Sequence, residues 1–398
     1  MATSPATPRM TSVRPLSLDR RLADRTRVLT APVPVIVGGC GCGRTERLRR
    51  LHRELGTRTS QYIDFERVAT TPERCLKAIV DASPFRQAVD ATPAAETTTA
   101  RGAYDAMLAF FMNAASADGA PATFLLDEVL ELRTFESFPG LRAALPELAR
   151  ALAYTRNRFI VCSRFSTRAA RWSETVPERY ELLPLAPLSQ EDVREAMVAD
   201  LGAHEAEDLA GLVHALTAGR PSYVRLLIEA MMSMTRGGTA DPISALAASL
   251  SRGGGLDQRC RFSYELRLHR ARGYGALKAI LDLLAEDEPL TLTQISQRLG
   301  RTPGSTKDYL SWLQDVDMLA SHRKRYTYSD PLLRLWVRLH SHPTPPGEER
   351  TAAEVQTYTL QRLELADAER AKAGAALVDE PAAVGARGGA RSGIIEID

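Results

Sequence analysis

A glycine-rich segment between an apolar stretch and a helix restricts the fold of this chain more than any other feature. Residues 35–45 read Val-Ile-Val-Gly-Gly-Cys-Gly-Cys-Gly-Arg-Thr, and residues 46–55 have the apolar spacing of a helix. A loop between a strand and a helix can surround a phosphate with backbone N–H groups, because the helix N-terminus adds a partial positive charge. Glycine lets the backbone approach the ligand with positive φ angles. The segment predicts an α/β fold with a phosphate site, and a plain strand-to-helix turn is the alternative.

This loop matches the phosphate-binding motif G-x-x-x-x-G-K-[ST] at every fixed position except one. Gly38 and Gly43 are the glycines and Thr45 is the hydroxyl residue, whereas Arg44 stands where the motif has lysine. The dinucleotide motif G-x-G-x-x-G does not fit, because its third glycine would have to be Arg44 or Glu46. The predicted nucleotide contacts are Gly38, Gly39, Cys40, Gly41, Cys42, Gly43, Arg44, Thr45 and Glu46.

Two acidic residues follow another apolar strand, roughly 80 residues downstream of the loop. Residues 123–128 read Thr-Phe-Leu-Leu-Asp-Glu. In a parallel sheet, the end of such a strand faces the ligand crevice. There Asp127 can hold Mg²⁺ and Glu128 can polarise an attacking water. Many strands end in a charged pair, so this motif indicates a nucleotide site only in combination with the phosphate loop upstream.

Short apolar strands alternate with helices over the first half of the chain. Strands are predicted at residues 34–37, 61–65, 122–127, 158–162 and 179–183, and helices at 46–55, 76–82 and 102–115, with a loop over 83–99. Uniformly apolar strands are typical of a parallel sheet that is covered by helices on both faces. We therefore predict a three-layer α/β sandwich over residues 31–188, preceded by a basic segment over residues 1–30.

The second half of the chain is predicted to be mainly helical. Ser189 has the features of an N-cap and begins a helical lid over residues 189–250, which ends before a glycine-rich break at 252–255. Helices at 276–285, 292–299 and 305–316, followed by a β-wing over 318–328, have the order of a winged helix-turn-helix, which we assign to residues 262–342. Residues 343–398 are predicted to form a polar helix to about Lys372 and then a disordered acidic tail.

The charge balance argues against a protein that binds nucleic acid through its overall charge. The 398 residues include 51 basic and 49 acidic side chains, a net charge of +2. No stretch is apolar enough for a signal peptide or a membrane span, so we expect a cytoplasmic protein without a membrane partner. The five cysteines form an odd, scattered set, which favours free thiols, and Cys40 and Cys42 lack a second ligand pair at zinc spacing.

Taken together, these motifs resemble the AAA+ and STAND branch of P-loop ATPases, and most closely the archaeal-type ATPase family. That family joins a P-loop NTPase core, a helical lid and a winged helix, and the resemblance covers roughly residues 30–340. Besides the phosphate loop and the acidic pair, it rests on residues 161–164 (Val-Cys-Ser-Arg), 217–223 (Thr-Ala-Gly-Arg-Pro-Ser-Tyr) and 330–336 (Asp-Pro-Leu-Leu-Arg-Leu-Trp). The order and spacing of these segments support the resemblance more than any one of them alone.

The resemblance implies roles for single residues in binding ATP and Mg²⁺. Thr45 and Asp127 would serve Mg²⁺, and Glu128 would activate water. Ser163 would sense the γ-phosphate, although an ordinary polar residue at a strand end is an equal alternative.

The same resemblance implies functions for residues further along the chain. Pro221 and Tyr223 would border the base, although this segment can also be a plain turn between helices. Arg164, Arg168 and Arg171 are candidates for an arginine finger that reaches a neighbouring subunit. In so arginine-rich a chain, a solvated surface position is the simpler interpretation for each of the three.

Arg44 is the main departure from the family's pattern. Lysine is a compact charge that fits inside the loop, whereas a guanidinium is larger, planar and prefers fork-like contacts with phosphate. ATP binding can survive this change while hydrolysis slows or fails, because phosphoryl transfer depends on positioning. Only five of the 51 basic residues are lysines, so Arg44 also fits a general bias of the chain. We expect Mg²⁺-dependent ATP binding and slow ATPase activity, with Arg44 and Glu128 as the catalytic residues.

Two roles remain open for the winged helix. Its wing carries His-Arg-Lys-Arg at residues 322–325 beside Tyr326 and Tyr328, a combination that can grip DNA phosphates. The predicted recognition helix has Lys307 among several aspartates and lacks a row of base-reading side chains, so packing against a protein, including a second copy of the chain, fits as well. The two hypotheses are a nucleotide-dependent switch coupled to the winged helix, and a DNA-binding or scaffold regulator with a degenerate nucleotide site.

Overall fold

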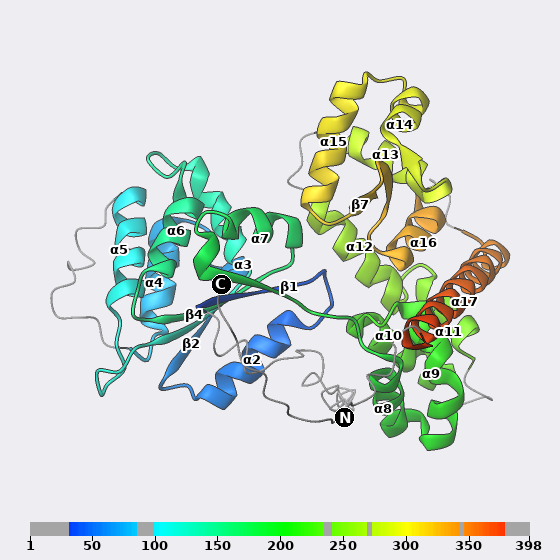
Figure 1. Ribbon diagram of the computed structural model, residues 1–398, viewed down its shortest axis with the longest axis horizontal. Coiled ribbons are helices and arrows are strands. Elements are labelled where there is room, and N and C mark those ends of the chain that lie inside the picture. Colours follow the sequence, from blue (N-terminus) through cyan, green and yellow to red (C-terminus); the bar gives the residue numbers. More distant parts are fainter. Residues whose placement is uncertain (1–31, 86–98, 235–240, 269–272, 342–345, 379–398) are drawn as a thin grey trace, which may run out of the picture.

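The structure is a computed structural model that describes residues 32–85, 99–234, 241–268, 273–341 and 346–378. Figure 1 shows an α/β body and a largely helical body side by side. The basic segment 1–30, most of the predicted 83–99 loop and the end of the acidic tail lie outside the described residues. No helix within the described ranges is long and apolar enough to cross a membrane.

Five parallel strands form the central sheet of the α/β body. They are β1 (Val33–Val37), β2 (Ser60–Asp64), β3 (Thr123–Asp127), β4 (Arg158–Ser163) and β5 (Tyr180–Pro184), in the spatial order β2-β3-β4-β1-β5. Each predicted strand is present to within one residue at either end. The register pairs Asp64 with Asp127 and Val37 with Ser163, so the carboxyl ends of these strands meet at one edge of the sheet.

Helices cover both faces of this sheet, which confirms the predicted three-layer arrangement. On one face α2 (Arg44–Leu55) packs Leu48 and Leu51 into a core with Ile36 and Leu125. The opposite face carries α4 (Pro72–Asp81), α5 (Ala100–Asn113), α6 (Ala144–Ala153) and α7 (Ser166–Ser173), as Figure 1 shows, together with the short helices α3 (Phe65–Val68) and η2 (Val129–Ser137). Its larger core is built on aromatic rings. A further short helix, η3 (Pro177–Arg179), directly precedes β5.

The lid region is helical, as predicted. Its helices are α8 (Gln190–Leu201), α9 (Ala203–Thr217), α10 (Pro221–Met234) and α11 (Pro242–Leu250). Ser189 caps α8, because its hydroxyl accepts the N–H of Asp192 while the Asp192 carboxylate accepts the N–H of Ser189. A further helix, α12 (Gly255–Leu268), follows the glycine-rich break at once and was not predicted.

The winged helix follows α12 in the order that the sequence indicated. It consists of α13 (Tyr274–Glu286), β6 (Leu290–Thr291), α14 (Leu292–Leu299), α15 (Pro303–Asp315), β7 (Leu319–His322), β8 (Arg325–Tyr328) and α16 (Pro331–His340). Arg323 and Lys324 turn the wing with φ angles of 49° and 63°, as a two-residue hairpin turn requires. One apolar core runs through both the lid helices and the winged helix, so the two pack as one body.

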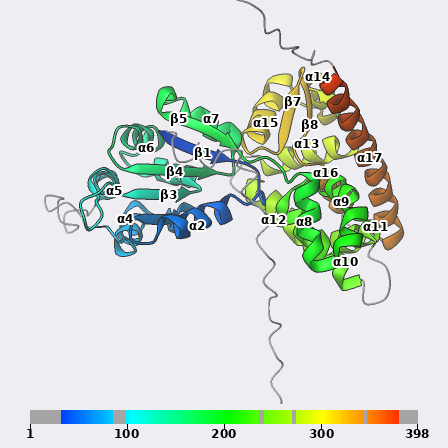
Figure 2. The same ribbon diagram turned by 60° about the horizontal axis from the view of Figure 1, so that its bottom comes forward.

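The polar helix predicted near the C-terminus is α17 (Glu348–Val378). Figure 2 shows it along the outer side of the helical body, away from the α/β body. Val355 and Tyr358 are buried on its inner face, and the Tyr358 hydroxyl donates to the Leu216 carbonyl at 2.8 Å. This helix is therefore fastened to the lid rather than free in solvent.

Candidate phosphate-binding site

The glycine-rich loop leaves β1 and turns directly into α2. Gly41 and Gly43 have φ angles of +80° and +95°, which glycine adopts without strain. Gly43 is the N-cap of α2 and has no side chain to cap the first N–H groups of the helix. Those N–H groups have no partner within the helix. The loop therefore presents N–H donors that the helix itself does not use, together with a helix dipole, at the carboxyl edge of the sheet, as an anion site requires.

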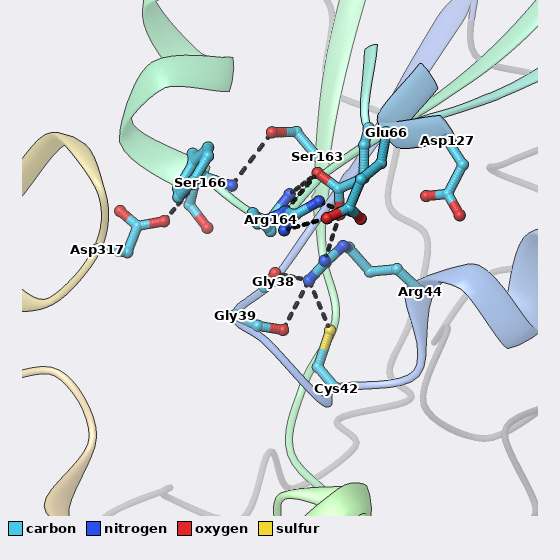
Figure 3. Close-up of polar contacts among 12 residues, drawn as sticks. Gly38, Gly39, Cys42, Arg44, Glu66, Asp127, Ser163, Arg164, Ser166 and Asp317 are labelled. Carbon is cyan, nitrogen blue, oxygen red and sulfur yellow. Dashed lines mark hydrogen bonds and ion pairs between the residues drawn. The ribbon is translucent and has the colours of Figure 1, made fainter. Parts of the chain in front are cut away.

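Arg44 folds back into this loop, as Figure 3 shows. Its Nη1 donates to the Gly38 carbonyl, to the Gly39 carbonyl at 2.6 Å and to the Cys42 Sγ at 3.3 Å. Its Nη2 donates to the Glu128 Oε1 at 2.7 Å. With the residue only 6% exposed, the guanidinium is an internal bridge between the loop and the acidic pair.

Glu128 is held between two arginines. Its Oε1 pairs with Arg44, while its Oε2 accepts the backbone N–H of Arg164 at 3.0 Å and lies 3.0 Å from the Arg164 Nε. Arg164 in turn donates to the Glu66 Oε2 at 2.6 Å. Burial alone would raise the pKa of Glu128, but the two arginines lower it below its ordinary value. Glu128 is therefore ionised, with both oxygens engaged by protein.

Asp127 has the surroundings of a metal ligand. It is 2% exposed, its Oδ2 accepts the Tyr62 hydroxyl at 2.8 Å, and its carboxylate is hydrogen-bonded to Thr45. Burial raises its pKa above the ordinary value despite these hydrogen bonds. The buried Oδ1 has no hydrogen-bond partner within the described residues. An orphaned carboxylate oxygen beside a hydroxyl is a donor set that suits Mg²⁺.

Two other predicted ligand contacts, Ser163 and Glu46, differ in their exposure to solvent. Ser163 is buried at the end of β4, beside β1, and its hydroxyl accepts the N–H of Phe165 at 3.1 Å. Glu46 is exposed and pairs with Arg53 at 3.1 Å, so the structure does not bring its carboxylate to the loop.

The start of α10 contacts the tip of the loop. Pro221 is buried there as the first residue of α10, and the N–H of Ser222 donates to the Gly41 carbonyl at 3.1 Å. Tyr223 is turned toward the winged helix instead, because its buried hydroxyl donates to the Asp330 Oδ2 at 2.8 Å. The predicted segment thus docks on the phosphate loop through a backbone group that sequence reasoning missed.

Three arginines of the helical body approach the same loop. Arg220 Nη1 and Arg267 Nη2 lie 3.1 and 3.8 Å from the point that a Cβ atom on Gly39 would occupy, and Arg259 Nη2 lies 2.9 Å from the corresponding point on Gly41. Arg220 belongs to the segment 217–223 that the sequence singled out, whereas no sequence signal distinguished Arg259 and Arg267, which lie on the unpredicted helix α12.

The three finger candidates lie in different settings. Arg164 is 4% exposed, so the predicted surface position is wrong for this residue, which Glu66 and Glu128 hold inside the chain. Arg168 lies over the Trp312 ring at 4.9 Å. Arg171 is exposed and pairs with Asp315 of α15.

These last contacts belong to an interface between α7 and the winged helix. Asp317 accepts the N–H of Ser166 and of Thr167, the latter at 3.3 Å, and also the Thr167 hydroxyl at 2.9 Å. Figure 3 places this contact beside Arg164 and Ser163. The end of the predicted recognition helix is therefore joined to the edge of the sheet that carries the phosphate loop.

No family model matches this sequence, and no curated protein matches it significantly. Among solved structures, the Walker-type ATPase of Pyrococcus abyssi aligns with a TM-score of 0.57 at 15% identity, over 85% of this chain and 99% of that one. The Cdc6p protein of Pyrobaculum aerophilum aligns with a TM-score of 0.39 at 12% identity, over 90% and 97% of the two chains. The Orc1 protein of Aeropyrum pernix, solved in complex with DNA, aligns with a TM-score of 0.39 at 16% identity, over 85% and 91%.

At such low identity, the Pyrococcus abyssi protein supports a statement about the fold alone. It aligns over nearly its whole length with both bodies of the present chain. The chain therefore has the fold of that Walker-type ATPase, and the predicted P-loop fold, with helices after the α/β core, is confirmed.

Proposed function

We propose that this chain binds ATP with Mg²⁺ and acts as a nucleotide-dependent switch, with slow hydrolysis. The observation that carries the proposal is the bridge formed by Arg44, which reaches the loop carbonyls and Glu128 with one guanidinium. When bound, ATP supplies phosphate oxygens that compete with the loop carbonyls and the Glu128 carboxylate for the Arg44 guanidinium. A guanidinium forms fork-like contacts with phosphate that are about twice as strong as neutral hydrogen bonds.

Arg44 thereby links the state of the loop to Glu128. When the guanidinium turns toward phosphate, Glu128 loses one of its two arginine partners and keeps Arg164. Arg164 precedes the first turn of α7 by two residues, and Asp317 of the winged helix caps that turn. Two hydrogen bonds and the backbone between residues 164 and 166 therefore connect Glu128 to the winged helix.

Slow turnover follows from the same contacts. A general base must reach the proton that it accepts within hydrogen-bond distance. Both oxygens of Glu128 are engaged by arginine groups, so water activation requires at least one of them to leave. We expect binding to be the stronger activity.

The binding proposal is tested by titrating a fluorescent ATP analogue with and without Mg²⁺. We expect Mg²⁺-dependent binding below about millimolar concentration, and its loss in Asp127→Asn. Asp64→Asn is the matched control, because Asp64 is the register partner of Asp127 on the neighbouring strand. Mg²⁺-independent or absent binding in the unaltered protein contradicts the proposal.

A second candidate is a DNA-binding or scaffold regulator whose nucleotide site is degenerate, and the occupied oxygens of Glu128 favour it. The predicted DNA grip is weaker than the sequence indicated, because Tyr328 is buried and its hydroxyl donates to the Leu281 carbonyl at 2.7 Å. His322, Arg323 and Lys324 remain exposed on the wing. Glu128→Gln separates the candidates: a switch loses turnover and retains ATP, whereas a scaffold shows no turnover to lose.

A further inference from the structure

One thiol of the phosphate loop lies among guanidinium groups. Cys40 is buried between Gly39 and Gly41, the two residues that Arg220, Arg259 and Arg267 approach. The positive charges of Arg44 and Arg164 also favour the ionised form of this thiol. Five arginines from four segments of the chain therefore lie around the part of the loop that carries this thiol, while the loop's other thiol, Cys42, accepts the Arg44 Nη1 at 3.3 Å.

Of these five arginines, Arg267 has the least compensation for its buried positive charge. It is 3% exposed, and its Nε and Nη1 atoms have no hydrogen-bond partner within the described residues. Arg44 and Arg164, in contrast, share Glu128, and Arg220 lies 3.4 Å from Asp330. A buried charge without compensation is costly, so this place favours a negative group.

The cysteines of the chain differ in how their surroundings affect ionisation. Burial alone would raise the pKa of the Cys40 thiol, but Arg267, Arg164, Arg44 and Arg259 together hold it below its ordinary value. Burial raises the pKa of Cys75, Cys162 and Cys260 instead. These three provide internal controls for any measurement on Cys40.

We propose that Cys40 is a reactive thiolate that takes up a low-molecular-weight thiol from the corresponding disulfide. The Cys40 sulfur attacks one sulfur of R–S–S–R, which forms the mixed disulfide Cys40–S–S–R while the second sulfur leaves as R–S⁻. Cys40 is oxidised and the departing thiolate is the reduced product, so no other reagent is needed.

The attached group occupies the loop that the proposed function assigns to phosphate. It is joined next to Gly41, whose carbonyl accepts the N–H of Ser222 at 3.1 Å, so it cannot be accommodated without moving the start of α10 or the loop. Modification therefore prevents nucleotide binding. This consequence rests on the proposed function, whereas the reactivity of Cys40 does not.

The reactivity is tested by incubating the full-length protein with oxidised glutathione at pH 7 and locating the modification by peptide mass mapping. An ordinary thiol is only about 3% ionised at that pH. We expect Cys40 to react at least about tenfold faster than Cys75, Cys162 and Cys260, and the midpoint of its alkylation by iodoacetamide to lie at a lower pH than the midpoints of those three thiols. Equal rates for the four thiols overturn the proposal.

Two variants test the source of the reactivity. Arg267→Met should move the alkylation midpoint to higher pH, and Arg259→Met, at a half-buried position, provides the same test if the first variant does not fold. An unchanged midpoint in both contradicts the role of these arginines.

The regulatory consequence has a separate readout. The fluorescent ATP analogue should bind the unmodified protein and fail to bind after glutathionylation, with binding restored by dithiothreitol. Equal binding before and after modification overturns the regulatory role. If the unmodified protein binds no analogue, the proposed function fails, and the reactivity of Cys40 is decided by the mapping alone.

Discussion

Arg44 makes contacts that a single lysine nitrogen could not make together. Its Nη1 reaches the carbonyls of Gly38 and Gly39, and its Nη2 reaches Glu128. A lysine ammonium is one compact charge, whereas a guanidinium spreads five donors over a planar fork. The arginine therefore ties the loop and the acid to each other.

Replacing this arginine should release Glu128. We expect Arg44→Lys to raise ATP turnover about tenfold or more, because one hydrogen bond to a charged group is worth about 1.5–3 kcal/mol. Phosphate release at saturating ATP and Mg²⁺ measures the effect. Arg53→Lys, an exposed position on the same helix, is the matched control and should leave turnover unchanged. Turnover at or below that of the unaltered protein shows that Arg44 does not restrain Glu128.

At the scale of residues, the sequence predicted which charged residues lie at the phosphate loop but not which residues they pair with. The pattern around Gly38 and Gly43 predicted the loop and the position of Arg44. It also assigned Glu46 to the ligand, although that side chain turns to solvent and pairs with Arg53. The partner of Arg44 lies 84 residues away and is brought near only by the order of the strands.

At the scale of elements, α7 depends on the winged helix for its cap. Phe165 at its N-cap position supplies no side-chain hydrogen bond, and Asp317 accepts the first N–H groups instead. A carboxylate at a helix N-terminus also interacts favourably with the helix dipole. Two of the aspartates near the recognition helix, Asp315 and Asp317, thus have partners on α7.

This contact can be weakened without disturbing the backbone. Asp317 has a φ angle of 52°, a conformation that asparagine tolerates. Asp317→Asn removes the charge and should cost about 1 kcal/mol, so the amides of Ser166 and Thr167 should exchange hydrogen about fivefold faster. Asp308→Asn, exposed on α15, is the control. Equal protection in the two variants means that the Asp317 charge does not hold α7.

The sequence predicted those helices and strands whose caps and apolar spacing are evident within the segment itself. The predicted helix at residues 292–299 coincides with α14, because its cap and its apolar spacing are both local signals. Helix α12 was missed because polar residues lie on its buried side. Asp257 is buried there and accepts the Trp336 Nε1 at 2.8 Å. Such a partner is 79 residues away and leaves no periodic signal in the sequence.

At the scale of the whole molecule, two groups of contacts join the bodies. Asp317 and Asp315 hold the winged helix to α7, while the Ser222 N–H holds the lid to the phosphate loop and the Arg220 guanidinium lies beside Gly39. Arg220 also donates to the Ser329 carbonyl at 3.0 Å, which links the loop contact to the winged helix. The loop is therefore the point where both bodies can respond to one ligand.

A methyl group on the loop should separate the bodies. Gly41 and Gly253 have φ angles of +80° and +85°, so alanine causes similar backbone strain at both, about 1–2 kcal/mol. An added Cβ overlaps the Ser222 side chain at Gly41 and meets nothing within 4 Å at Gly253. We expect Gly41→Ala to increase the radius of gyration in small-angle X-ray scattering and to speed exchange of the Ser222 amide.

Gly253→Ala is the control for this comparison. It introduces the same backbone strain, but its added Cβ meets no neighbouring atom. It should scatter like the unaltered protein even where its thermal stability falls. If the two variants scatter alike, the lid does not depend on the loop for its position. A switch that passes from the phosphate loop through Ser222 to the helical body is then excluded, and the path through Arg164 and α7 is the one that remains.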